Sequence, residues 1–126
     1  MKDEKEQPRQ DLKARTREFA LRIIRLYTAL PSTSVAQVIG KQLLRSGTSV
    51  GAHYREAFRS RSDAEFISKI EGGLQELDET DYWLELLAGA DIMSTERLTE
   101  LRNEANELIA IFTTCAKNAK STRKVD

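Results

Sequence analysis

The sequence has one cysteine, Cys115, and one histidine, His53. A single cysteine cannot form a disulfide within the chain, and these two residues cannot supply the Cys and His ligands of a structural zinc site. We therefore expect a reducing compartment, no structural metal and no cofactor.

Glycine and proline are also scarce, at six and two residues. A sheet of many short strands needs more turn residues than this, so an all-β fold is excluded. No apolar run approaches the ~20 residues that cross a bilayer, and residues 1–11 are polar with no apolar core of a signal peptide. These absences predict a cytoplasmic protein with no membrane partner.

The common catalytic motifs are missing as well. The sequence contains no G-x-x-x-x-G-K-[ST], G-x-S-x-G, H-E-x-x-H or C-x-x-C, and a catalytic triad would have to use His53. The sequence therefore predicts a protein that is not an enzyme.

What the sequence does contain is helical periodicity. Apolar residues recur at steps of three and four in four segments, which we place at residues 11–29, 34–59, 62–89 and 94–119. The expected boundary residues are Pro31 after the first segment, capping boxes at Ser34 and Ser62, and a C-terminal cap at Gly89. Short connections make successive helices antiparallel, so we predict an all-α, up-down-up-down four-helix bundle over residues 11–119. Residues 1–10 and 120–126 lack this periodicity and are predicted to be a disordered arm and tail.

Charge is unevenly distributed, although the 20 basic and 20 acidic residues cancel. Residues 31–61 carry five basic residues and one acidic residue, whereas residues 62–93 carry one basic and nine acidic residues. Segments of opposite sign can neutralise each other within or between chains, so the basic segment alone does not imply nucleic acid.

Small residues crowd the middle of the second predicted helix, where Gly47 and Gly51 are four residues apart. A glycine there costs about 1 kcal/mol relative to alanine, so something must offset it. The first interpretation is close packing of a neighbouring helix, with Gly72 and Gly73 as candidate partners. The other is a smooth strip at an oligomer interface.

The same helix carries a basic stripe that suits phosphate binding. The candidate nucleic-acid-binding residues are Lys41, Arg45, His53, Arg55, Arg59 and Arg61. Two alternatives stay open: the basic side chains pair with the acidic third helix, and His53 is an ordinary interface or core residue.

The third helix has a second apolar stripe. Tyr82 and Trp83 are adjacent and point about 100° apart, so they cannot both face one core, and Leu86 follows Tyr82 by four residues. A helix with two apolar sides usually has a partner outside its own bundle. We therefore predict Tyr82, Trp83 and Leu86 at an oligomer interface. The carboxylates of this helix lack the Glu-x-x-His pattern of a di-iron bundle, so they predict a solvated face or an intersubunit salt-bridge row and no metal site.

Three stretches resemble a known family: residues 42–52 (QLLRSGTSVGA), Ser62-x-x-Glu65-Phe66, and residues 82–87 (YWLELL). They are similar to the four-helix-bundle proteins of intervening sequences in bacterial large-subunit ribosomal RNA genes, a family that includes the accessory variability protein of diversity-generating retroelements. The resemblance implies a bacterial protomer that forms a barrel-shaped homopentamer. In the retroelement branch it also implies binding of nucleic acid and of a reverse transcriptase, with Arg45 and Arg55 at the family's basic positions.

Two functions follow as hypotheses. The first is a homo-oligomeric, pentameric accessory protein that binds RNA or DNA and a reverse transcriptase. The alternative is a protein-interaction scaffold without nucleic-acid binding, in which the basic second helix and the acidic third helix neutralise each other across subunits.

Overall fold

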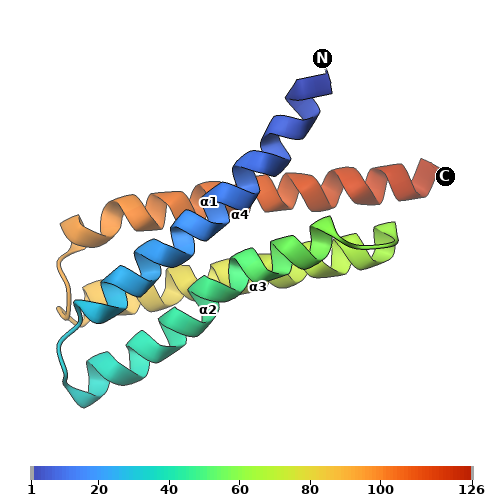
Figure 1. Ribbon diagram of the computed structural model, residues 1–126. Coiled ribbons are helices and arrows are strands. Elements are labelled where there is room, and N and C mark those ends of the chain that lie inside the picture. The colour runs from blue at the N-terminus through green and yellow to red at the C-terminus, as the bar shows by residue number, and fades with distance from the viewer. Residues whose placement is uncertain (1, 126) are drawn as a thin grey trace.

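A computed structural model describes residues 2–125, with side chains for residues 12–122. Four helices account for nearly all of these residues: α1 (Lys2–Thr28), α2 (Ser34–Phe58), α3 (Asp63–Gly89) and α4 (Thr95–Val125). They run alternately up and down, as Figure 1 shows, which confirms the predicted all-α bundle. Both termini and the α2–α3 turn lie at one end, opposite the other two connections.

Each helix packs mainly on its neighbours in sequence. Helix α2 lies between α1 and α3, α4 packs on α3, and α1 touches α4 over a short stretch only. Figure 1 shows α1 crossing the other helices obliquely, with its N-terminal end directed away from the bundle. As a result α2 and α3 form the central pair of the bundle, and α1 meets α4 mainly where Arg15 pairs with Glu104 and Glu107.

The core is built from the apolar positions that the periodicity identified. Its largest fully buried side chains include Phe19, Leu43, Leu77, Leu108 and Phe112. The burial of large side chains in each helix supplies most of the stability, because isolated helices of this length are marginal in water.

The helix ends differ from the predictions in four places. The cap of α2 is Thr33, not Ser34: the Thr33 hydroxyl accepts a hydrogen bond from the Ala36 amide (3.3 Å). Helix α3 begins as predicted after Ser62, whose hydroxyl accepts from the Glu65 amide (3.1 Å). Helices α1 and α4 extend beyond Asp11 and Lys120, because polar residues continue a helix without showing its period. The predicted disorder of residues 1–10 and 120–126 stays a prediction.

The predicted cap at Gly89 is also wrong. Gly89 is the last helical residue, and Asp91 takes the left-handed conformation with φ of 57°. The amides of Asp91 and Ile92 donate to the carbonyls of Ala88 and Leu87, each at 3.0 Å. This pair of bonds is a Schellman motif, with an aspartate in the position that glycine usually fills.

Candidate functional site

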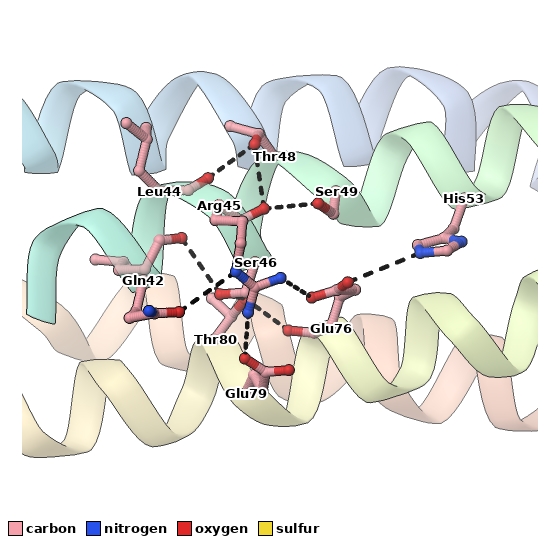
Figure 2. A network of polar contacts seen from close by, with 11 residues as sticks. Gln42, Leu44, Arg45, Ser46, Thr48, Ser49, His53, Glu76, Glu79 and Thr80 are labelled. Carbon is pink, nitrogen blue, oxygen red and sulfur yellow. Dashed lines mark hydrogen bonds and ion pairs between the residues drawn. The ribbon is translucent and has the colours of Figure 1, made fainter.

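Arg45 is held by helix α3. Its guanidinium donates to Glu76 (3.3 Å) and to Glu79, and also to Gln42 on its own helix (3.3 Å). Figure 2 shows these carboxylates converging on Arg45 from α3. The pairing with the acidic helix therefore occurs within one chain, and Arg45 is already neutralised before any ligand arrives.

Behind this network, a buried polar contact fixes the register of α2 against α3. The hydroxyls of Ser46 and Thr80 lie 2.9 Å apart and both side chains are fully buried. Because the helices are antiparallel, this contact places the N-terminal turns of α2 beside the C-terminal turns of α3.

His53 lies in the α2–α3 interface as well. Its Nε2 is 3.8 Å from Glu76, its Nδ1 is 3.9 Å from Glu56, and a methyl group on Gly72 would come within 3.0 Å of the ring. The Nδ1 atom is buried and has no hydrogen-bond partner among the described residues. The ring is thus half-buried between the helices, which matches the interface interpretation better than stacking on a base.

The other four candidate residues are exposed. Lys41, Arg55, Arg59 and Arg61 form no ion pair with any residue from 12 to 122. The acidic residue of α2, Glu56, pairs with Lys69 of α3 (3.2 Å). The predicted basic set therefore divides into two residues that hold the bundle together and four that face solvent.

Helix α1 adds to the exposed group. Thr16 packs on Gly51, so the turn of α1 that contains Lys13 and Arg17 lies opposite the turn of α2 that contains Arg55. Lys13 and Arg17 are exposed and have no ion-pair partner in the described part of the chain. We define the basic face as Lys13, Arg17, Lys41, Arg55 and Arg59. The sequence showed the spacing of Lys13 and Arg17, but only the α1–α2 register brings them to this face.

The glycines of α2 are buried beneath α1. A Cβ on Gly47 would lie 2.7 Å from Ile23, and one on Gly51 would lie 3.3 Å from Thr16. Gly72 and Gly73 are not their partners: these face His53 and Phe112 instead. The small residues thus allow α1 to approach closely, and a role for Gly47 and Gly51 at a subunit interface stays a prediction.

A separate apolar patch lies on the outer side of α3. Tyr82 leaves the core and is 52% exposed, while Trp83 is half-buried and its buried indole N–H has no hydrogen-bond partner among the described residues. The two rings lie 5.1 Å apart, and Leu86 follows Tyr82 by one helical turn. We define the outer apolar patch as Tyr82, Trp83 and Leu86. Val35 and Val38, at the start of α2, are 58% and 66% exposed, but the register set by Ser46 and Thr80 places them beside the last turn of α3, beyond this patch.

Two further carboxylates of α3 bond to side chains of α4. Asp81 accepts two hydrogen bonds from Arg102, the shorter 2.9 Å, and Glu71 accepts one from Lys120 (2.6 Å). The hydrogen bond with Asp81 raises the pKa of Arg102. These are ion pairs within the protomer, and the described residues contain no group of three His, Cys, Asp or Glu side chains placed to hold a metal.

A groove of about 580 Å³ opens at the end of the bundle that carries the α2–α3 turn. We name it the turn groove. It is lined by the end of α2, the start of α3, the C-terminal half of α4 and Leu12 of α1. Cys115 is half-buried in its wall.

The model of one protein family, the 23S rRNA-intervening sequence proteins, matches residues 9–114. The chain belongs to this family. A crystal structure of a protein of unknown function from the S23 ribosomal protein family of Bacteroides thetaiotaomicron is 38% identical. It has a TM-score of 0.82, and the alignment covers 87% of this chain and 98% of that one. A search of curated proteins found no match. No described helix is long and apolar enough to span a membrane.

In this intervening-sequence family member, the motif that carried the resemblance is a packing surface. Within residues 42–52 the buried positions are Leu43, Ser46, Gly47, Val50 and Gly51. Its one basic residue, Arg45, pairs with α3. The motif therefore accounts for the packing of the helices. The residues of the exposed basic face all lie outside it.

Proposed function

We propose that the protein is a non-enzymatic, homo-oligomeric protein that binds nucleic acid through its basic face. The observation that supports this most directly is the set of exposed basic side chains on α1 and α2 with no acidic partner in the described structure. Guanidinium and ammonium groups without an acidic partner are available to phosphates. When they neutralise phosphates, counterions are released, and this release favours binding.

Zero net charge does not oppose the proposal. Several acidic residues of α3 are engaged within the chain: Glu76 and Glu79 pair with Arg45, and Asp81 and Glu71 pair with Arg102 and Lys120 of α4. Glu56 of α2 pairs with Lys69. Local charge at the basic face is therefore positive even though the whole chain is neutral.

Self-association is proposed through the outer apolar patch. Exposed aliphatic and aromatic side chains gathered on one face are typical of protein interfaces, and Tyr and Trp are enriched there. From the family resemblance, we propose that the assembly is a pentamer and that a reverse transcriptase is a further partner.

The experiment is titration of labelled RNA and DNA with the wild type and three variants at several salt concentrations. Arg55→Ala with Arg59→Ala should weaken binding and lower the salt slope by about one for each phosphate that is no longer neutralised. Arg97→Ala is the matched control, because Arg97 is exposed and without an ion pair in the described residues but lies on α4. Arg45→Ala should change stability more than affinity.

A second function, a protein-interaction scaffold, is favoured by the outer apolar patch alone. If an intact oligomer shows no affinity for RNA or DNA at physiological ionic strength, the nucleic-acid proposal is wrong and the scaffold remains. Equal losses of affinity in the Arg55/Arg59 and Arg97 variants would show that the charge of the whole protein, and not the basic face, governs binding.

A further inference from the structure

We propose that the turn groove holds an unpaired nucleobase, so that the protein binds single-stranded nucleic acid in preference to duplex. This inference rests on the nucleic-acid binding proposed above. A base within a duplex is stacked on both faces and cannot enter a groove, whereas the bases of a single strand can turn outward and stack on a protein side chain.

The stacking surface is the ring of Phe58 at the end of α2. It is 54% exposed, and exposing so large an apolar ring is unfavourable unless something covers it. The ring of Tyr54 is buried behind Phe58, and the centroids of these two rings are 6.3 Å apart. The Tyr54 ring in turn packs on Phe112 of the core, with 6.0 Å between the ring centroids. Phe58 is thus supported from within and open from outside, with half-buried Phe66 also in the groove wall.

Polar groups suited to a base and its phosphate surround this ring. Asn118 lines the groove, is exposed, and makes no side-chain hydrogen bond to a described residue, so its amide can both donate to and accept from a base edge. Arg61 also lines the groove without an ion pair to a described residue, and Arg59 lies near it in sequence at the end of the basic face. The acidic residue of the lining is Asp63, in the first turn of α3.

The basic face and the turn groove are connected along α2. Arg55 and Arg59 lead along α2 from the basic face to Phe58 and the turn, so a strand whose phosphates follow the basic face reaches the turn groove. The ring of His53, by contrast, packs against Gly72 of α3.

The test compares a labelled oligouridine with an RNA duplex of the same length by fluorescence anisotropy. Phe58→Ala should weaken binding of the single strand by roughly 5- to 150-fold, the range for removal of one base-aromatic stack. Binding of the duplex should not change. Phe58→Trp is the matched control, since it keeps an aromatic ring of the groove at the same exposed position and should retain the affinity.

The outcomes separate this inference from the proposed function. If the wild type binds duplex as well as single strand, and Phe58→Ala affects neither or both alike, the groove does not hold a base while the basic face still binds phosphates. If the wild type binds no nucleic acid, both proposals are wrong. If Phe58→Ala abolishes self-association by light scattering and leaves affinity unchanged, the groove is occupied by a second copy, and the base-binding proposal is wrong.

Photo-crosslinking gives a measurement on the unaltered protein. An oligonucleotide with 4-thiouracil should crosslink to peptides that contain Phe58 or Asn118. Crosslinks confined to α1 and the middle of α2 would contradict the proposal, because they would place the bases on the basic face.

Discussion

At Gly47 the helices α1 and α2 approach so closely that a methyl group does not fit. A Cβ there would lie 2.7 Å from Ile23, below any ordinary contact distance. We expect Gly47→Ala to lower the free energy of unfolding by about 1–3 kcal/mol, because overpacking outweighs the gain of about 1 kcal/mol in helix propensity. Urea denaturation measures the change.

Gly89→Ala is the control for this substitution. No atom lies within 4 Å of a Cβ placed on Gly89, and its φ is not positive. Alanine should therefore raise the stability by about 0.5–1 kcal/mol. A stabilising effect of Gly47→Ala would contradict the close approach of α1 and α2.

The left-handed Asp91 is a second residue whose local conformation can be tested. Glycine tolerates a φ of 57° without the steric cost that a Cβ brings, about 1–2 kcal/mol. Asp91→Gly should accordingly raise the melting temperature, by an amount that corresponds to about 0.5–1 kcal/mol after the greater entropy of unfolded glycine is counted. Ala90→Gly, one residue earlier at negative φ, should lower it.

At the scale of the helix, the ion pair between Arg102 and Asp81 joins α4 to α3 with two hydrogen bonds. Arg102→Lys keeps the charge but removes this paired geometry, so we expect the free energy of unfolding to fall by about 0.5–1 kcal/mol. Arg25→Lys is the control, because Arg25 is exposed and its single contact with Glu18 is 3.4 Å; no measurable change is expected there. Equal effects would mean that the α3–α4 pair contributes nothing specific.

The pH dependence of this pair has a definite sign. Pairing with Asp81 raises the pKa of Arg102 above its ordinary value. A raised pKa in the folded state means that the contribution is fully present below the ordinary pKa and is lost only as the pH rises through the raised one. The stability of the wild type should thus show no step from Arg102 between neutral and moderately alkaline pH, and thermal unfolding across that range would reveal one.

Helix periodicity was enough to predict four helices and their alternation, because buried positions such as Leu43, Leu77 and Leu108 recur at helical spacing. It could not choose between Thr33 and Ser34 as the cap, since both are hydroxyl residues that precede the apolar pattern. It also could not show that Asp91 would end α3, because that depends on where the chain must turn toward α4.

At the scale of the whole molecule, the sequence could predict which residues form the candidate site. It could not predict which of them pair with α3 and which stay exposed. The sequence identified the basic residues of α2 and the acidic residues of α3 as possible partners. The register of the two helices decides that Arg45 reaches Glu76 while Arg55 does not reach α3, and a single sequence does not contain that register. The same limit hid Lys13 and Arg17, which join the basic face only when α1 and α2 are placed side by side.

The structure separates two surfaces, and this separation gives the last prediction. Tyr82 belongs to the outer apolar patch, whereas Ile24, 40% exposed, lies about two helical turns beyond Arg17 on α1. Tyr82→Glu should dissociate the oligomer, because it places a charge in an interface that would have to desolvate it. Ile24→Glu should leave the assembly intact and weaken nucleic-acid binding, because it adds a negative charge on the helix that supplies Lys13 and Arg17 to the basic face.

Light scattering and anisotropy on both variants, with circular dichroism to confirm folding, measure the two properties independently. Two copies of the chain must meet at one surface and nucleic acid at another if the protein is to bind its ligand as an assembly. If either variant loses both properties, the two surfaces are not independent, and a ligand that bridges subunits across the α2 helix would explain the result better than two separate faces.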